Sequence, residues 1–230
     1  MRAPSLRAAL ALALSALCAA AGAQTAFSVS ALSDYRYRGV SLSNERPTWR
    51  AGVAHDGASG WYLGGSIVGV SLEPAGRQAQ LLGYGGVTGT LWQHVGWEAG
   101  ATGVHFSADS AADYHEWFAG VHGERWNARL HYSPDYFGSG ARTAYGELNA
   151  GKSLSRWWRA TAHLGALRRL QRAGGVGDTW SLDGALGLAL ARDAWDVGFE
   201  LTAGSRSGLY PVVYGHHARG ALVLSATYAF

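Results

Sequence analysis

The 230-residue sequence contains one cysteine, five prolines and few charged residues, which make up 15% of the chain. The cysteine, Cys18, lies in the N-terminal leader described below, so the remaining chain cannot form a disulfide or a thiolate metal site. A transmembrane helix needs about 18 to 20 uninterrupted apolar residues, and the best run after the leader, Gly184–Ala191, has eight. Composition therefore excludes a disulfide-rich scaffold and a bundle of membrane-spanning helices.

The residues that are abundant exclude two further classes. Hydrophobic residues make up 48% of the chain and aromatic residues 12%, with ten tryptophans and 33 glycines. Disordered chains lack such aromatic content, and collagen needs a glycine at every third position, which is not seen here. A chain of this length forms a single domain in many all-β sandwiches and barrels.

The N-terminus predicts a signal peptide over residues 1–23. Two arginines, Arg2 and Arg7, precede an apolar run at residues 8–20, and Ala21-Gly22-Ala23 gives a small-residue cleavage site before Gln24. The protein is therefore expected to be exported. Without the two leader arginines, 17 basic residues face 16 acidic ones, a balance that gives no support for nucleic-acid binding.

A lipoprotein is the alternative interpretation of the leader. In that case Cys18 would carry the lipid anchor. Lipoprotein signals need a small residue directly before the cysteine, and Leu17 occupies that position. This disfavours the lipoprotein and leaves cleavage before Gln24 as the preferred interpretation.

After the leader, apolar and polar residues alternate with a period of two, which indicates β-strands with one apolar and one polar face. At 195–203, Trp, Val, Phe, Leu and Ala alternate with Asp, Gly, Glu and Thr. The same pattern occurs at 126–133 and 158–164. Alternation alone suits both a soluble sandwich with a wet outer face and a membrane barrel with a wet lumen.

The C-terminal strand favours the barrel. Apolar residues occupy every second position from Ala218 to Phe230, and Tyr228 and Phe230 are the last two on that face. A terminal phenylalanine after alternating apolar residues resembles the C-terminal signature of bacterial outer-membrane barrels, which their assembly machinery recognises through that residue. Together with the expected export, it predicts an all-β fold, a transmembrane up-and-down antiparallel β-barrel.

We expect twelve strands, an even number that returns the C-terminus to the side of the N-terminus. Short turns at 56–60, 123–124 and 192–193 would lie on one side, and longer links at 40–46, 133–141, 170–177 and 205–216 on the other. The fourth and fifth segments are rich in glycine, so ten strands remain an alternative. The expected strands are 26–39, 47–56, 61–71, 78–87, 95–106, 112–122, 125–133, 142–151, 156–169, 178–191, 194–204 and 217–230.

Tryptophans recur at the beginnings of the third, fifth, seventh, ninth and eleventh segments, and Phe27 occupies that place in the first. All of them would lie at one membrane interface, where amphipathic rings are favoured at the boundary of lipid and water. The last two aromatic residues of the chain would join them in one girdle. The predicted girdle consists of Trp61, Trp97, Trp126, Trp158, Trp195, Tyr228 and Phe230.

Three stretches resemble the TorF-like porin family of proteobacteria. The first runs from Ser33 to Gly64, the second from Ala112 to Gly138, and the third is the C-terminal phenylalanine. The fourth segment departs from the family pattern at Gln78–Gln80, where an acidic residue is expected. The resemblance implies an outer-membrane porin-type barrel and brings no catalytic residues. Its matching residues in the first stretch are Asp34, Tyr35, Arg38, Gly39, Trp49, Gly52, Ser59, Gly60, Trp61 and Tyr62.

The polar face of the strands collects charges of both signs. Facing lipid, each charge would cost roughly 2–4 kcal/mol at the midplane, so we place them in the lumen. They either brace the wall as hydrated ion pairs or form a constriction that sets ion selectivity. The candidates for selectivity are Asp34, Arg36, Arg38, Arg50, Glu98, Glu116, Arg129, Glu147, Arg159, Asp183 and Glu200; Asp56, His131, His163, Asp196 and Arg219 share their face.

The densest positive patch combines Arg36 and Arg38 on one expected strand with Arg50 on the next. Two arginines two residues apart on a strand point to the same side. The hypothesis that follows is that this patch favours anionic solutes.

No motif of an enzyme is present, and no cofactor is predicted. His216-His217 lack a nearby carboxylate and point in different directions on an extended chain, so no metal site is predicted there. Three arginines within Leu167–Arg172 would meet lipopolysaccharide phosphates or remain solvated. The sequence thus predicts a bacterial outer-membrane porin in contact with lipid, lipopolysaccharide and the assembly machinery, giving passive diffusion of small hydrophilic solutes. The alternative is a closed barrel with a structural or loop-mediated binding role.

Overall fold

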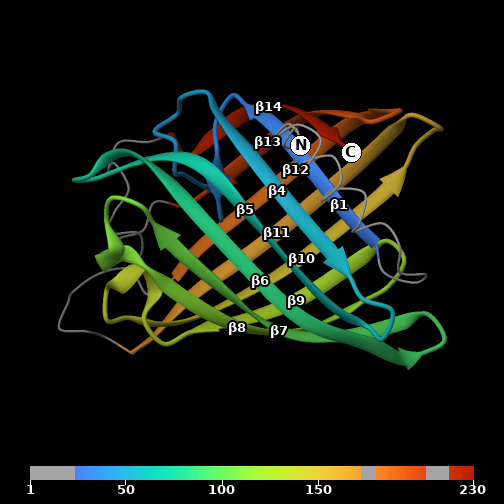
Figure 1. Cartoon of the computed structure of the whole chain (residues 1–230), viewed down its shortest axis with the longest axis horizontal. Coiled ribbons are helices and arrows are strands. Elements are labelled where there is room, and N and C mark those ends of the chain that lie inside the picture. Colours follow the sequence, from blue (N-terminus) through green and yellow to red (C-terminus); the bar gives the residue numbers. More distant parts are fainter. Residues whose placement is uncertain (1–23, 172–179, 206–217) are drawn as a thin grey trace, which may run out of the picture.

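The computed structural model describes residues 24–171, 180–205 and 218–230, and twelve strands of this part form a closed antiparallel barrel (Figure 1). Two short strands, β2 (Arg36–Tyr37) and β3 (Val40–Ser41), pair with each other outside the barrel sheet. The barrel strands are β1 (Gln24–Leu32), β4 (Thr48–Asp56), β5 (Trp61–Leu72), β6 (Gly76–Trp92), β7 (Val95–Phe106), β8 (Tyr114–His122), β9 (Trp126–Ser133), β10 (Arg142–Ser153), β11 (Trp158–Gln171), β12 (Trp180–Arg192), β13 (Trp195–Gly204) and β14 (Gly220–Ala229).

The barrel closes because its first and last strands pair. β1 pairs with β14 from Ser28↔Ala229 to Leu32↔Ser225, and with β4 on its other side. Every barrel strand therefore has two hydrogen-bonded neighbours, and no sheet edge is left open. The prediction of twelve strands is confirmed, and the glycine-rich fourth and fifth segments are both full strands, β6 and β7.

The predicted first strand, 26–39, is wrong at its C-terminal end. β1 stops at Leu32, and residues 33–47 leave the wall and fold into the barrel. Tyr35 and Tyr37 alternate with charged residues as in a strand, and the same period serves the short hairpin of β2 and β3, where both tyrosines pack against a buried core. The other predicted segments are recovered with their ends shifted by at most three residues, except that β6 runs five residues further, to Trp92.

The connections differ in length at the two ends of the barrel, as expected. Turns at 57–60, 93–94, 123–125, 154–157 and 193–194 lie at one end, the turn end, together with Gln24 and Phe230. The opposite end, the loop end, carries 33–47, 107–113 and 134–141, and one short turn at 73–75 that the sequence did not suggest. Two short 3₁₀ helices, η1 (Ser110–Ala112) and η2 (Tyr136–Gly138), belong to these loops. No helix in the described ranges is long and apolar enough to cross a membrane.

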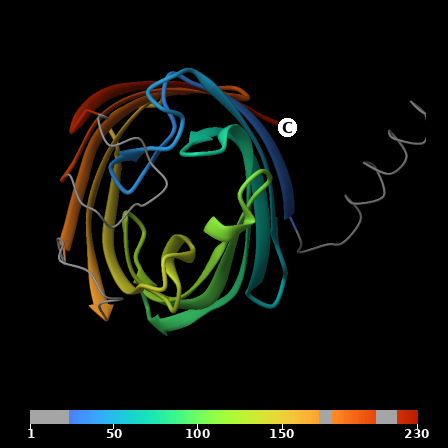
Figure 2. The ribbon, with the colours of Figure 1, turned by 90° about the vertical axis from the view of Figure 1, so that its left-hand side faces the viewer.

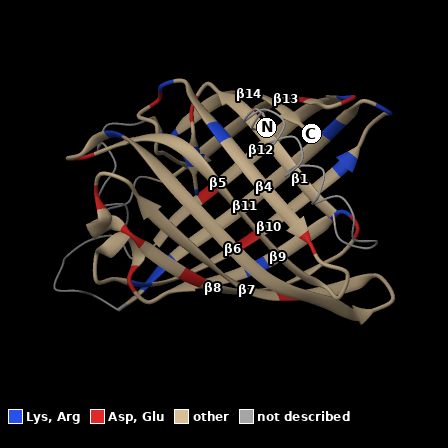
Figure 3. Cartoon of the chain, in the orientation of Figure 1, with Lys and Arg blue, Asp and Glu red and all other residues tan. Residues whose placement is uncertain are grey.

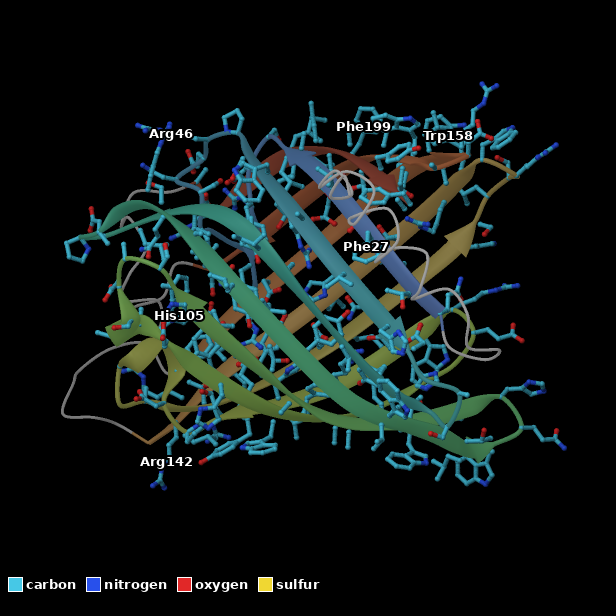
Figure 4. The ribbon with its side chains drawn as sticks, in the orientation of Figure 1. Phe27, Arg46, His105, Arg142, Trp158 and Phe199 are labelled. Carbon is cyan, nitrogen blue, oxygen red and sulfur yellow. The ribbon has the colours of Figure 1, made fainter. Side chains whose placement is uncertain are left out.

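The two faces of the wall differ in chemistry. Leu186, Leu201 and Leu164 point outward and are each about two-thirds exposed, while Asp183, Glu200 and His163 of the same strands line the lumen. Figure 4 shows Phe199 and Trp158 among these outer side chains, with Arg46, His105 and Arg142 at the loop end. Figure 3 marks charged positions at both ends of the barrel and at single positions along the strands.

A buried apolar cluster fills part of the bore at the loop end. Residues 33–47, named the inner segment here, contribute Val40 and Leu42 to it. β5, β7, β8, β10, β11, η1 and η2 contribute the remaining members, among them Phe106, Ala112 and Phe137. Burying a side chain of this size stabilises the fold by roughly 1.5–3 kcal/mol. Figure 2, which looks into the barrel from the loop end, shows the inner segment (blue) and the loops with η1 (green) and η2 (yellow) inside the ring of strands.

Candidate functional site: the barrel lumen

Two adjoining cavities occupy the lumen on the turn side of the inner segment. The larger, about 1130 Å³, reaches the turns at 123–125, and is named the outer chamber. The smaller, about 570 Å³, is lined by Arg36, Arg38 and Gly39 of the inner segment, and is named the inner chamber. Both are bordered by the same residues where they meet, including Tyr62, Arg129 and Glu200. The lumen is therefore a connected polar space bounded on one side by the inner segment.

Most of the predicted lumen residues line these chambers. Glu98 and Arg159 line the outer chamber, and Arg129 and Glu200 line both. Two of the others do not. Asp34 is buried within the inner segment, and Arg50 on β4 is exposed but lines neither chamber. The candidates at the inner chamber alone are Arg36, Arg38, Glu116, Glu147 and Asp183.

Glu98 organises one wall of the lumen. Its carboxylate accepts hydrogen bonds from the Tyr62 hydroxyl at 2.9 Å and from the Arg129 guanidinium at 2.7 and 3.0 Å. Tyr62 comes from β5 and Arg129 from β9, so each side chain crosses one strand to reach β7. The glycines of the strands crossed, Gly86 and Gly120, make this possible: a Cβ atom there would lie 2.7 Å from the Tyr62 hydroxyl and 2.9 Å from Arg129 Cγ.

Gly86 of β6 and Gly120 of β8 thus let these two side chains lie flat against the wall. Flat side chains leave room in the bore, where upright ones would fill it. Sequence reasoning placed Glu98 and Arg129 in the lumen but missed Tyr62. The outward position of its neighbour Trp61, 40% exposed, implies by alternation that Tyr62 points inward.

At the inner chamber, Arg38 forms a bidentate ion pair with Glu116 of β8, with distances of 2.8 and 2.7 Å. The guanidinium also lies 3.9 Å above the centre of the Tyr145 ring and 4.7 Å from that of Tyr37. Both charged side chains are almost fully buried, 5% and 3% exposed. Burial by itself lowers the pKa of Arg38, but the carboxylate of Glu116 more than reverses this and raises that pKa well above its usual range. Arg38 therefore stays charged, which matches the short, charge-assisted geometry.

Asp34 fixes the other arginine. Its carboxylate accepts bonds from the Ser41 and Ser43 hydroxyls at 2.6 and 2.8 Å and from Arg36 Nε at 2.8 Å. Arg36 also donates to the carbonyl oxygens of Gly39 and Ala218 at 3.0 and 3.1 Å. The Arg36 side chain is 4% exposed as a result.

The predicted positive patch of Arg36, Arg38 and Arg50 is therefore not present as expected. Arg36 and Arg38 sit on the inner segment instead of a wall strand, and each is neutralised by a carboxylate. The physical reason is burial, because an arginine taken out of water needs a paired anion. Arg50 stands apart on β4.

Two histidines lie between acceptor groups on the wall behind Arg38. His131 is 3.5 Å from both Glu116 and Glu147. His163 contacts Asp183 at 2.7 Å through Nε2 and the Asn149 side-chain oxygen at 2.7 Å through Nδ1. These contacts link β8, β9, β10, β11 and β12 on the lumen side. Alternation could have identified Asn149, since it is two residues from Glu147 on the same strand.

The predicted aromatic girdle residues all lie on the outer surface near the turn end. Their exposed fractions run from 38% for Trp158 to 62% for Phe230. Trp195 packs on Tyr228 at 5.1 Å, and Phe27 stacks on Phe230 at 6.0 Å. These contacts tie the last strand to β13 and β1.

Within residues 24–171, 180–205 and 218–230, no group of three or more histidine, cysteine or carboxylate residues could hold a metal ion. His216-His217 lie outside the described residues, as do the glycine cluster at 174–177 and Arg172.

The strand topology defines a closed, twelve-stranded antiparallel barrel of the kind found in porins. A family model described as "Bacterial protein of unknown function (Gcw_chp)" matches residues 16–205, and the chain belongs to that family. No curated protein matches the sequence.

Among solved structures, a "KdgM porin" is similar with a TM-score of 0.57 and 11% identity, over 89% of this chain and 99% of that one. A "NanC porin" is similar with a TM-score of 0.58 and 10% identity, over 89% and 98%. At these identities the likeness concerns the fold.

Proposed function

We propose that the protein is an outer-membrane channel of the porin type, through which small hydrophilic solutes diffuse passively by way of its charged lumen. The observation that carries the proposal is the pair of connected polar chambers inside a closed barrel with an apolar outer surface. The predicted signal peptide, the terminal Phe230 and the resemblance to the TorF-like porin family support the same location.

The surface chemistry supports a lipid environment. Large apolar side chains such as Leu164, Leu186 and Leu201 are about two-thirds exposed on the outside of the barrel. A monomeric protein in water rarely exposes a continuous apolar belt, whereas lipid removes its cost. Outer-membrane lipid and lipopolysaccharide are the proposed partners of this surface, and the barrel assembly machinery is the proposed partner of Phe230.

The lumen chemistry supports weak discrimination between small ions. The charges that line the chambers are largely paired, as in Arg129 with Glu98 and Arg159 with Asp196 at 3.0 Å. Paired charges offer water and polar solutes both donors and acceptors, without a strong field of one sign. Uncharged hydrophilic solutes are therefore the substrates that the lumen suits best.

Single-channel recording tests the proposal. The full-length chain is produced in a Gram-negative host, purified from its outer membrane, shown to be heat-modifiable on a gel, and added to a planar bilayer. Discrete, reproducible steps are expected, together with uptake of small uncharged sugars by liposomes that contain the protein. A folded, inserted barrel that gives neither steps nor uptake would contradict the channel.

A closed barrel with a structural or loop-mediated binding role is the second candidate. The apolar cluster at the loop end favours it, because Leu42 and Phe106 are fully buried inside the bore. The same recording separates the two candidates, since the closed barrel inserts and folds but does not conduct.

A further inference from the structure

The inner segment spans the bore from one side of the barrel to the other. At its tip, Gly39 packs so closely on the wall that a Cβ atom there would lie 2.8 Å from Asp183 Cβ and 2.9 Å from Gly204 Cα. On the opposite side, the Leu42 carbonyl oxygen accepts a hydrogen bond from the Ser71 amide at 2.7 Å. The segment thus contacts the wall at β12 and β13 and again at β5.

Arg38 is the residue that ties the tip of this segment to a third part of the wall. Its two hydrogen bonds reach Glu116 on β8, and its guanidinium lies against Tyr145 of β10. The backbone at Arg38 has a φ of 50°, in the left-handed region that residues with a side chain adopt rarely. Gly39 follows with a φ of 77°. The side-chain contacts of Arg38 therefore hold the chain in a turn that local preferences do not favour.

The Arg38–Glu116 pair also marks the boundary between two environments. On its turn side, both residues line the inner chamber. On its loop side lie Val40 and Tyr136, which are 1% and 0% exposed in the apolar cluster. The polar path that begins at the turn end meets the inner segment at this pair.

We propose that Arg38 is the positioning residue that holds the inner segment across the lumen as the constriction of the channel, with Glu116 as its anchor. This inference rests on the proposed channel function and identifies the inner segment as the element that limits the passage of solutes. Removing Glu116 leaves the buried guanidinium of Arg38 without a carboxylate, and removing Arg38 leaves the buried Glu116 with only the more distant contacts to His131 and Tyr37, each at 3.5 Å. Proteins relieve a poorly compensated buried charge by moving it to water. The segment then leaves the bore, and the passage from the two chambers to the loop end widens.

Thiol labelling tests the position of the segment without relying on conductance. In a Cys18→Ala background, a single cysteine replaces either Val40 of the inner segment or Ala112 of η1, which are 1% and 2% exposed. The Glu116→Gln variant should react with a maleimide at position 40 at least tenfold faster than the parent, with no change at position 112. Arg38→Gln should do the same, and Asp196→Asn, which breaks an exposed ion pair at the turn end, should not.

The labelling has two outcomes that overturn the inference. Unchanged reactivity at position 40 in both variants would show that the ion pair does not hold the segment. An equal rise at positions 40 and 112 would show that the pair only stabilises the whole loop end.

Conductance then tests the constriction itself. Glu116→Gln and Arg38→Gln should each raise the mean single-channel conductance at least threefold over the parent chain. Conductance steps of equal size in the parent chain and in both variants would support the channel function but contradict the inner segment as its constriction. Selective labelling at position 40 without conductance in any variant would instead reject the channel, and the constriction with it.

Discussion

Single glycines control how much of the lumen stays open beside Glu98. Gly86 and Gly120 each lie under a long side chain that crosses their strand to reach the same carboxylate. The sequence shows these glycines only as weak points in the alternation of β6 and β8. Their role follows from what lies above them, which depends on the pairing of three strands.

Gly120→Val should displace Arg129 from Glu98, because the new Cβ atom would overlap Arg129 Cγ and the Ala128 carbonyl oxygen. Leaving Glu98 without its guanidinium should lower the free energy of unfolding by about 2 kcal/mol. Urea unfolding of the purified protein in detergent, followed on heat-modifiability gels, measures the change.

Gly103→Ala is the matched control on the neighbouring strand, since no atom lies within 4 Å of a Cβ at that position. The free energy of unfolding of this variant should stay within about 0.5 kcal/mol of that of the parent chain. Equal effects of the two substitutions would mean that strand glycines matter here for backbone reasons alone.

At the scale of elements, the ends of the chain close the barrel. Phe27 and Phe230 exchange two backbone hydrogen bonds of 3.0 Å, and their rings stack. The terminal phenylalanine thus has a structural contact in addition to the recognition by assembly machinery that the sequence predicts. The two roles can be separated experimentally. Closure of the barrel depends on the backbone hydrogen bonds of Phe230, whereas recognition by the assembly machinery depends on its side chain.

Phe230→Ala keeps the backbone bonds and removes the ring. We expect this variant to refold in detergent almost as well as the parent chain, but to reach the outer membrane of a Gram-negative host in clearly lower amounts. Removing residue 230 should impair both refolding and membrane insertion, since the two backbone hydrogen bonds between Phe27 and Phe230 are then lost. Band shifts on unheated gels report both the refolded and the membrane-inserted fractions. Normal membrane levels of Phe230→Ala would contradict the recognition role.

For the whole molecule, the distribution of charge decides what the lumen can select. Arg36 and Arg38, which the sequence suggested as an anion-selective patch, are paired and buried. Glu200 differs from them, because it is exposed and lies where the two chambers meet. It is therefore the better candidate for influencing the passage of ions.

Glu200→Lys should shift the reversal potential in a salt gradient toward that of the anion, because a fixed positive charge then lies at the junction of the chambers. Arg50→Ser should leave the reversal potential unchanged, since Arg50 lines neither chamber. Reversal potentials of both variants, measured in a planar bilayer, test which residue influences ion selectivity. A shift with Arg50→Ser and none with Glu200→Lys would restore the original arginine hypothesis.

The sequence by itself determined the wall of this protein. The number of strands, their outward and inward faces, and the aromatic girdle near the turn end all follow from a period of two and from the spacing of turns. Both are local properties of the sequence. Trp61 and Trp195 could be placed from their positions at the beginnings of segments, and Glu98 and Arg129 from alternation alone.

Only the tertiary structure decided what fills the lumen. Arg38 and Glu116 are 78 positions apart, and nothing in their neighbourhoods indicates that they meet. Residues 33–39 alternate as a strand does, so the turn of the inner segment into the barrel depends on the apolar cluster supplied by β5, β7, β8, β10 and β11. Contacts of this kind depend on the closed barrel, because closure brings strands that are distant in the sequence to face one another across the bore.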